Sequence, residues 1–377
     1  MSAGQPCKSS SPTPPSPTRG EAPRSAMIDC HTHLKAHDAE AGTRLLNHAA
    51  AAGVEAIAIA VVSELAGRSG NPAALVAKAR HPKQIFLFAG LDYSALTQEV
   101  DHRLTLSLGR QVERLRALGS DGVKMLTGKP NVRRSSGIAL DSPVYEGCFA
   151  RLEALGMPLL WHVNDPEEFW DPERAPEWAT APGWIYDERF PTKESLYEEC
   201  GRVLERHPNL KVIFAHFYFL SADLKRAGEL LDRFPQVCLD LAPGIEMFHN
   251  FSADVEGARE FFVRYQDRIL FGTDLVEDSP ASRIEVVRRC LETADVFHVP
   301  TDEPLFWPDH RTTLRGLALP ADALAKIYGG NFRRLIGAEP RPLDREAVRK
   351  ELERLAAISD DRGVSPNVAR EMAQAFS

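Results

Sequence analysis

The chain has 377 residues, of which 44% are hydrophobic and 26% charged, a composition typical of a globular protein with a large core. Its formal net charge of -8, with no basic stripe between aromatic residues, argues against a nucleic-acid partner. The longest apolar stretch, residues 49–62, contains Gly53 and Glu55 and is too short and too polar for a bilayer, so no membrane span is expected.

Residues 1–26 are rich in serine and proline and lack the apolar core of a secretory signal. We predict that they form a disordered tail or that the start has been placed too early, with Met27 as the alternative initiator. The six cysteines are scattered and include no CxxC pair, which is typical of reduced thiols in a large domain. A cytoplasmic location is therefore expected.

From residue 27 onward, short apolar runs alternate with amphipathic segments. Near-continuous apolar runs are typical of strands covered on both faces, and eight are predicted: residues 27–31, 54–62, 85–91, 122–126, 158–163, 211–216, 237–241 and 269–273. Helices are predicted at residues 40–52, 72–80, 110–118, 144–155, 193–206, 222–234, 255–265 and 282–294. This alternation predicts a parallel sheet, and eight repeats close most simply into a (β/α)8 TIM barrel. A doubly wound open sheet is the alternative.

The first predicted strand carries the motif HTH. Alternate residues of an extended chain share a face, so Asp29, His31 and His33 point the same way. Two imidazoles placed like this can bind one metal ion. The pair also occurs by chance, and other ligands are needed before a metal site can be predicted.

Further polar residues follow other strands. Lys124 lies on the fourth strand, His162 ends the fifth, His216 ends the sixth and Asp274 follows the eighth. Each has a structural explanation when taken alone: a core histidine bonded to backbone, or an aspartate that caps a helix. In a (β/α)8 barrel, however, the chemistry lies at the carboxyl ends of strands. Imidazoles with one carboxylate suit Zn²⁺, or Mn²⁺ or Fe²⁺, so we predict a divalent metal site.

Longer blocks carry a family resemblance. They read HTH, ILFGTD, LERHPNLKVIFAHF, LDRFPQVCLDL, FFVRYQDRILFGTDL and IYGGNFRRLIG. Together with His162 and His216, these blocks resemble the amidohydrolase superfamily, in particular the amidohydrolase-related branch that includes enzymes similar to aminocarboxymuconate-semialdehyde decarboxylase. The resemblance spans about Met27 to Gly337, which implies a tail at 1–26, a metal-dependent hydrolase barrel at 27–337 and a helical extension at 338–377.

The resemblance implies roles for particular residues. His31, His33, His162 and Asp274 would bind one metal ion, and His216 would stay off the metal as a catalytic histidine that faces the substrate.

At two positions the sequence departs from the family pattern or leaves the number of metal ions open. After His216 the sequence Phe217-Tyr218-Phe219 replaces the glycine-rich turn frequent in relatives, so we expect a narrower or differently shaped pocket. Lys124 stands where binuclear members have a carbamylated lysine, but one metal is favoured because the related branch is mostly mononuclear.

The expected chemistry is hydrolysis of an amide, lactone or ester. A divalent ion lowers the pKa of a bound water from about 15.7 to roughly 7, Asp274 would accept its proton, and His216 would polarise the substrate carbonyl. The same residues suit a nonoxidative decarboxylase of an aromatic or muconate-type acid. A barrel that only binds a ligand is the third alternative.

The remaining predictions concern the substrate and the assembly. The long segment 165–192 contains Trp184 and Arg189, which we expect to contact a small aromatic or carboxylated substrate. Alternatively, this segment packs on the barrel rim or on a partner subunit. Residues 342–357 form a predicted amphipathic helix that packs on the outside of the barrel or in a dimer contact. A homodimer is expected, since dimers are common for this fold.

Overall fold

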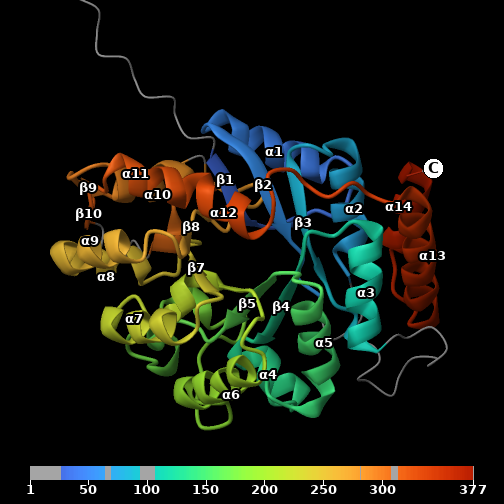
Figure 1. Ribbon diagram of the computed structural model, residues 1–377, viewed down its shortest axis with the longest axis horizontal. Coiled ribbons are helices and arrows are strands. Elements are labelled where there is room, and N and C mark those ends of the chain that lie inside the picture. The colour runs from blue at the N-terminus through green and yellow to red at the C-terminus, as the bar shows by residue number, and fades with distance from the viewer. Residues whose placement is uncertain (1–26, 64–68, 94–106, 281, 307–312, 377) are drawn as a thin grey trace, which may run out of the picture.

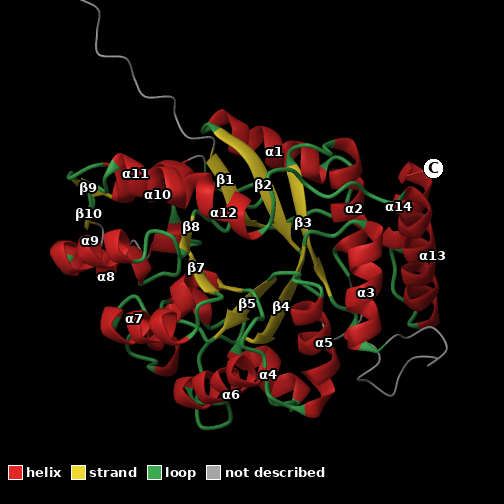
Figure 2. Ribbon diagram, in the orientation of Figure 1, coloured by secondary structure: helices red, strands yellow, loops and turns green. Residues whose placement is uncertain are grey.

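The computed structural model describes residues 27–63, 69–93, 107–280, 282–306 and 313–376. Eight parallel strands follow one another in sequence order around the centre of the molecule, and helices surround them (Figures 1 and 2). The strands are β1 (Met27–Thr32), β2 (Val54–Ala60), β3 (Ile85–Gly90), β4 (Gly122–Gly128), β5 (Leu159–Val163), β6 (Val212–Phe214), β7 (Val237–Asp240) and β8 (Ile269–Leu270).

The last strand returns to the first. The Cys30 N–H donates to the Phe271 carbonyl at 2.9 Å, and the His33 N–H donates to the Leu275 carbonyl at 2.8 Å. These bonds join β1 to the segment that follows β8, so the sheet closes on itself. The predicted (β/α)8 barrel is confirmed, and the open doubly wound sheet is excluded.

Helices alternate with the strands, as predicted. They are α1 (Ala41–Ala51), α2 (Asn71–Arg80), α3 (Leu108–Leu118), α4 (Pro130–Ser136), α5 (Pro143–Ala154), α6 (Lys193–Arg206), α7 (Leu224–Arg233), α8 (Met247–Ala253), α9 (Val255–Arg264), α10 (Ser282–Glu292), α11 (Ala321–Ala325), α12 (Asn331–Leu335), α13 (Arg345–Asp361) and α14 (Val368–Phe376). The short helices α4 and α8 and the antiparallel pair β9 (Val296–His298) and β10 (Thr313–Arg315) are additions that the sequence pattern did not predict.

Both faces of the strands are buried, which explains their near-continuous apolar sequences. On β2, Ala56 and Ala58 belong to the core inside the barrel, whereas Ile57 and Ile59 pack in the larger core under the helices. Phe332 of α12 adds to the inner core and lies edge-on to Phe86 of β3, with ring centroids 4.8 Å apart. The interior is thus a packed core, and polar side chains gather at the carboxyl ends of the strands.

β6 and β8 are among the five strands that end earlier than predicted. β6 stops at Phe214 because the backbone turns left-handed from His216 onward. β8 stops at Leu270 because the Phe271 N–H donates to the Ile327 carbonyl, in the π-helical segment Lys326–Gly330, instead of to a strand. Both departures bring the chain into the region where the predicted site residues lie.

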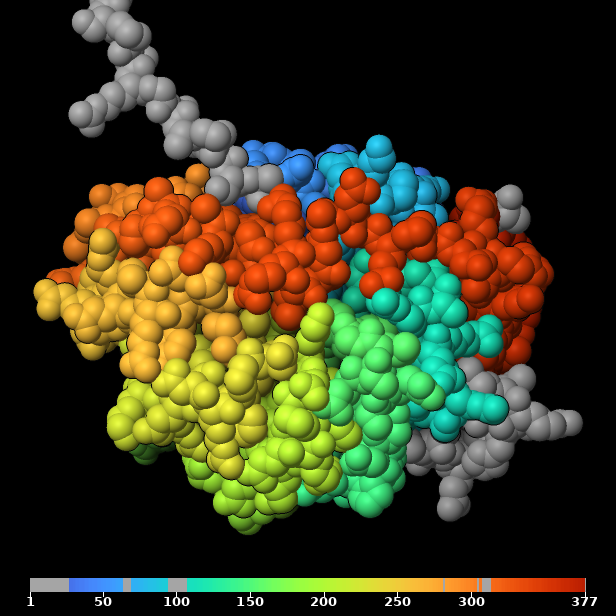
Figure 3. Space-filling view, viewed as in Figure 1, coloured from blue at the N-terminus to red at the C-terminus, as the bar shows by residue number. Residues whose placement is uncertain are grey.

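The C-terminal extension lies on the outside of the barrel. α14 packs on α2, and α13 contacts α3. Figure 3 shows this red segment on the flank of the molecule, beside the turquoise residues around α3. Arg354 of α13 donates to Asp92 at 3.0 Å, and the Asp344 N–H donates to the Leu118 carbonyl at 3.1 Å. The extension is therefore fixed to the barrel by polar bonds as well as by apolar packing.

Two other predictions bear on the whole chain. In the part of the chain that the structure describes, no helix combines the length and the apolar character needed to cross a membrane. The described cysteines are Cys30, Cys148, Cys200, Cys238 and Cys290, and all of them are buried and unpaired. The predicted tail at 1–26 lies outside the described residues.

Candidate active site

Each histidine of the HTH motif has its ring fixed by one hydrogen bond from Nδ1 to an oxygen atom. His31 Nδ1 lies 2.8 Å from Asp240 Oδ2, and His33 Nδ1 lies 2.5 Å from the Ala60 carbonyl oxygen. A carboxylate and a carbonyl only accept hydrogen bonds, so each Nδ1 carries the ring proton and donates. Both Nε2 atoms are then left with a lone pair.

Asp274 completes a group of three acceptors. The two Nε2 atoms lie 3.1 Å apart, and Asp274 Oδ1 lies 3.0 Å from His33 Nε2 and 3.9 Å from His31 Nε2. Three electron-rich atoms at these distances repel one another unless a cation lies among them. The ligand atoms of all three residues fall within 4.8 Å of one another, and they are the kinds that bind Zn²⁺, Mn²⁺ or Fe²⁺. The group therefore fits a divalent metal ion.

The backbone of Asp274 is strained. Its φ is 55°, in the left-handed region that non-glycine residues rarely adopt. The Asp274 N–H donates to the His31 carbonyl at 2.9 Å, and Arg283 Nη1 donates to the Asp274 carbonyl at 3.1 Å. These two bonds hold the residue in the conformation that turns its carboxylate toward the histidines. Backbone strain that the surroundings enforce is typical of functional sites.

The protonation states suit metal binding. Burial lowers the pKa of His31 and of His216 well below the ordinary value, and it lowers the pKa of His162 to about 4. Burial alone would raise the pKa of Asp274, but the neighbouring His33, His31 and His216 lower it well below the ordinary value. At neutral pH the site therefore offers neutral imidazoles at His31, His162 and His216 and an ionised carboxylate at Asp274, the forms that ligate metals.

His216 lies between the other histidines. Its ring centroid is 5.1 Å from that of His31 and 4.8 Å from that of His162. His216 Nδ1 donates to the Ala242 carbonyl at 3.0 Å, which leaves Nε2 unprotonated and without a partner of its own among the contacts described. His216 is therefore brought to the site as the sequence predicts, in a state that accepts a proton.

His162 lies beside the three-residue group but outside it. Its Nε2 is 3.2 Å from Asp165 Oδ1, a carboxylate whose pKa Lys129 and His162 lower against the effect of burial. His162 therefore donates through Nε2, and its Nδ1 keeps the lone pair that a metal ligand needs. The four-ligand set stays a prediction, in which His162 would bind through Nδ1.

Lys124 points at the same centre from β4. Its Nζ lies 3.0 Å from His31 Nε2, and the side chain is almost fully buried. Burial lowers the pKa of Lys124 to about 8. Within the described ranges, no carboxylate lies within 4.0 Å of this amine, so the site holds a buried cation without a salt bridge.

The family model described as "Amidohydrolase" matches residues 28–338. The chain belongs to the amidohydrolase family. Enzymes of this family depend on metal ions, and the group of His31, His33 and Asp274 is the part of this amidohydrolase that suits one. The resemblance inferred from the sequence blocks is confirmed.

Solved structures share the fold at low sequence identity. The chain is similar to 2,6-dihydroxybenzoate decarboxylase from Rhizobium, with a TM-score of 0.52, 13% identity, and coverage of 83% of this chain and 98% of that one. It is also similar to 5-carboxyvanillate decarboxylase from Sphingomonas paucimobilis, with a TM-score of 0.50, 13% identity, and coverage of 83% and 99%. An uncharacterized TIM-barrel protein from Bordetella bronchiseptica gives a TM-score of 0.50, 17% identity, and coverage of 83% and 99%. No curated protein sequence matches the chain.

Sequence reasoning missed Asp240, the last residue of β7. Its Oδ2 accepts from His31, and its Oδ1 accepts from the backbone N–H groups of His216 and Ala242 at 2.8 and 3.1 Å. One buried carboxylate therefore sets the tautomer of His31 and fixes the segment that carries His216, the predicted catalytic histidine. The signal was present, because Asp240 ends a strand in QVCLDL just as the recognised residues do.

The segment after β6 is left-handed throughout. The φ values of His216, Phe217, Tyr218 and Phe219 are 56°, 56°, 57° and 53°. These are the residues noted in the sequence as replacing a glycine-rich turn, and here large aromatic residues adopt the conformation that glycine favours. Phe219 then lies against both histidines, with centroids 5.2 Å from His216 and 5.5 Å from His162, and forms a wall of the site.

Of the two predicted substrate residues, Trp184 lies near the site and Arg189 does not. Lys129 Nζ lies 4.2 Å from the centroid of a Trp184 ring and 2.6 Å from Asp165 Oδ1, and Asp165 in turn contacts His162, so Trp184 is three contacts from His162. Arg189 is largely exposed and pairs with Asp187 at 2.5 Å. Substrate contacts by both residues stay predictions, and for Arg189 its bond to Asp187 would first have to break.

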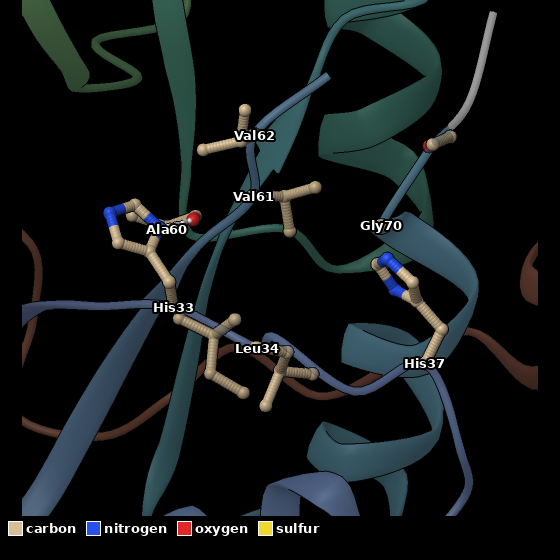
Figure 4. Close-up of a pocket in the computed structure, with 9 residues that line it drawn as sticks. His33, Leu34, His37, Ala60, Val61, Val62 and Gly70 are labelled. Atoms are coloured by element: carbon tan, nitrogen blue, oxygen red, sulfur yellow. Dashed lines mark hydrogen bonds between the residues drawn. The ribbon is translucent and has the colours of Figure 1, made fainter. Parts of the chain in front are cut away.

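A cavity of about 220 Å³ opens beside His33, one of the three residues that fit a metal ion. Figure 4 shows His33 and His37 on opposite sides of this cavity, with Leu34 and Val61 between them. The walls come from the carboxyl ends of β1 and β2 and from the segment just before α2. Ile59 and Val61 in this wall belong to the core under the helices, so the cavity lies on the outer side of the strands.

Proposed function

We propose that this amidohydrolase is a metal-dependent, nonoxidative decarboxylase of a small aromatic or unsaturated carboxylic acid. The observation that carries the proposal is Lys124, a buried ammonium group at 3.0 Å from His31 Nε2 with no carboxylate within 4.0 Å among the residues that the structure describes. A buried cation of this kind favours an anionic substrate over a neutral amide or ester, since a charge in a low-dielectric site is stabilised by an opposite charge.

The ion is proposed to be a single Zn²⁺, with Mn²⁺ or Fe²⁺ as alternatives. His31 Nε2, His33 Nε2 and Asp274 would hold it, and His162 would complete the set through Nδ1. When bound, the ion supplies positive charge that orients a carboxylate and stabilises the electrons left behind when carbon dioxide departs.

The residues of the chain then have separate tasks. Lys124 would bind a carboxylate oxygen of the substrate and keep it beside the metal site. Decarboxylation breaks the bond between the carboxylate and its carbon, and the electron pair that stays on that carbon must receive one proton. His216 Nε2 would take up that proton from solvent before the bond to the carboxylate breaks, because its Nδ1 is already used in the bond to Ala242, and would then deliver it to the carbon.

The solved structures give the proposal additional support. Two of the similar folds are named as decarboxylases of aromatic acids, 2,6-dihydroxybenzoate and 5-carboxyvanillate, and both are matched over nearly their whole length. Their identity of 13% supports the shared fold and leaves the substrate of this chain to be measured.

Hydrolysis of an amide, lactone or ester is the second candidate. It is favoured by Asp274, an ionised carboxylate about one-quarter exposed, whose Oδ1 lies 3.0 Å from His33. A carboxylate beside the metal site is the group that a hydrolase needs as proton acceptor for the attacking water.

One experiment separates the two functions. Protein loaded with Zn²⁺ or Mn²⁺ is incubated with dihydroxybenzoates and 5-carboxyvanillate, and in parallel with lactones and anilides, while carbon dioxide release and ester or amide cleavage are recorded. The proposal expects carbon dioxide from at least one acid and no cleavage of the neutral compounds. Cleavage without any carbon dioxide release would assign the site to hydrolysis instead. Lys124→Met is the matched control, because it removes the cation but keeps a side chain of similar length.

A further inference from the structure

The backbone of Asp274 is held on both sides of its Cα atom. Its N–H donates to the His31 carbonyl at 2.9 Å, which fixes the peptide plane before Cα. Its carbonyl accepts from Arg283 Nη1 at 3.1 Å, which fixes the plane after Cα. Since φ and ψ are the rotations that relate these two planes, the left-handed φ of 55° depends on one bond from β1 and one from α10.

Arg283 donates in this direction because its guanidinium group is fixed. Nε and Nη2 donate to the two carboxylate oxygens of Glu303 at 2.9 and 2.8 Å, and Nη1 then points at the Asp274 carbonyl. A planar guanidinium that binds a carboxylate through two parallel bonds cannot turn without breaking them. Glu303 thus determines where the third nitrogen points.

The Arg283–Glu303 pair is buried. The Arg283 side chain is 10% exposed and the Glu303 side chain is completely covered. Taking two charges out of water is costly, and a buried ion pair is often no more stabilising than apolar residues of similar volume. The stability of the fold therefore gives little reason for a charged pair at this place, whereas the bond to Asp274 gives one.

Glu303 is fixed in turn by the connection between β9 and β10. Its Oε1 also accepts from the Leu305 N–H at 3.2 Å. His249 Nε2 of α8 donates to the Phe306 carbonyl at 2.7 Å, and the Phe306 side chain is buried. The anchor of Arg283 therefore comes from a part of the chain that the sequence pattern did not predict, and α8 holds that part in place.

We propose that Arg283 and Glu303 are positioning residues for the metal centre: their ion pair holds the Asp274 backbone in the conformation that turns its carboxylate toward the two HTH histidines. Arg283 makes no ion pair within 4.0 Å with the Asp274 carboxylate, so it acts through the backbone carbonyl. This inference rests on the metal centre of the proposed function and is independent of the reaction performed there.

The test compares metal binding with and without this bond. In the double variant Arg283→Met with Glu303→Gln, no charge of the pair is left buried without its partner, so the protein should fold. The Asp274 carbonyl nevertheless loses its donor. Zn²⁺ affinity, measured by competition with a fluorescent chelator, should fall by about tenfold or more, as is typical when an outer partner of a metal ligand is lost. The visible absorption spectrum of bound Co²⁺ should also change, because the ligand carboxylate moves.

The matched control is the double variant Arg288→Met with Glu292→Gln. Arg288 and Glu292 lie on the same helix and form a two-bond pair through the same nitrogens, at 2.9 and 3.2 Å. This control should keep the native Zn²⁺ affinity and Co²⁺ spectrum. Thermal unfolding of the metal-free proteins shows which variants fold. The single variant Glu303→Gln, which keeps the Arg283 cation but loosens its fork, should also bind Zn²⁺ more weakly and serves if the double variant is unstable.

The outcomes separate this inference from the proposed function. Folded Arg283 and Glu303 variants with native Zn²⁺ affinity and an unchanged Co²⁺ spectrum would overturn it, because the bonds from β1 would then suffice to hold Asp274. A native chain that binds no Zn²⁺ would refute the metal centre itself. Weaker binding in the variants, with no carbon dioxide released by the native chain from any acid, would support this inference and refute the proposed reaction.

Discussion

Asp240 should control metal affinity although it never touches the ion. In Asp240→Asn the amide oxygen can still accept the backbone N–H groups of His216 and Ala242, so the segment after β6 keeps its support. The amide NH2 then faces His31 Nδ1, which also carries a proton. To avoid two opposed donors, the His31 ring must move its proton to Nε2, the atom that would bind the metal.

The size of the effect follows from this change of tautomer. Loss of an outer partner of a metal-binding histidine typically weakens metal affinity by about 10–100-fold. That is roughly 1.4–2.7 kcal/mol of binding free energy. The assay is competition for Zn²⁺ between the protein and a fluorescent chelator at constant pH, with thermal unfolding of the metal-free proteins as the folding check.

Asp232→Asn is the matched control for this prediction. Asp232 is a solvent-exposed aspartate that pairs with Arg264, so its substitution changes the same functional group far from any predicted ligand. It should leave Zn²⁺ affinity unchanged. An Asp240→Asn protein that folds normally and binds Zn²⁺ within twofold of the native chain would refute the tautomer argument.

Three further predictions concern catalysis, pH and strain. His216→Asn should lower kcat by about 100-fold or more while the bound metal stays at the native level, and a fully active variant would remove His216 from the reaction. Burial raises the pKa of Glu246 to about 8 from 4.5, so ionising this carboxyl lowers the free energy of unfolding of the native chain progressively from pH 4.5 to 8. Glu246→Gln lacks this effect, so its free energy of unfolding relative to the native chain should increase by about 3 kcal/mol between pH 5 and pH 8 in urea unfolding. A difference that stays constant with pH would contradict this. Phe217 has φ 56°, a conformation that glycine adopts more easily than alanine. Phe217→Gly should therefore be more stable than Phe217→Ala by about 1 kcal/mol, although glycine usually destabilises a chain relative to alanine. If the alanine variant is the more stable one, the backbone at Phe217 is not strained.

The barrel could be predicted because its signal is local and repeated. Every strand is buried on both faces, so each one is a short apolar run, and each helix between strands has its own amphipathic pattern. The strand ends were harder to predict. β6 and β8 lose their last residues to a left-handed turn and to a bond with the Lys326–Gly330 segment, and neither effect is visible in local hydrophobicity.

The site was predictable in part for the same reason. His31, His33, His216 and Asp274 lie at strand exits, and parallel strands bring such exits together. The partners that tune them were not found, because Asp240 acts through a contact between β7 and β1 that only the closed barrel creates. The predicted homodimer stays a prediction.

Contacts of the long segment 165–192 were also beyond sequence reasoning. Its aromatic residues form a cluster of their own that includes Phe169, Tyr186 and Trp184. Tyr186 donates a hydrogen bond to Asp165 at 2.5 Å, and the same carboxylate also accepts hydrogen bonds from His162 and Lys129. The sequence predicted that this segment contacts the substrate, but the hydrogen bonds that tie it to the site depend on the folded chain.

The central claim is that the chain binds one divalent ion through the two HTH histidines and Asp274. The most direct measurement is the metal content of purified protein by mass spectrometry, after dialysis against Zn²⁺ and removal of excess, for the native chain and for His33→Asn and Asp274→Asn. We expect about one ion per native chain and a large loss in each variant that still folds. A native chain without bound metal, or variants that retain the full amount, would contradict the account.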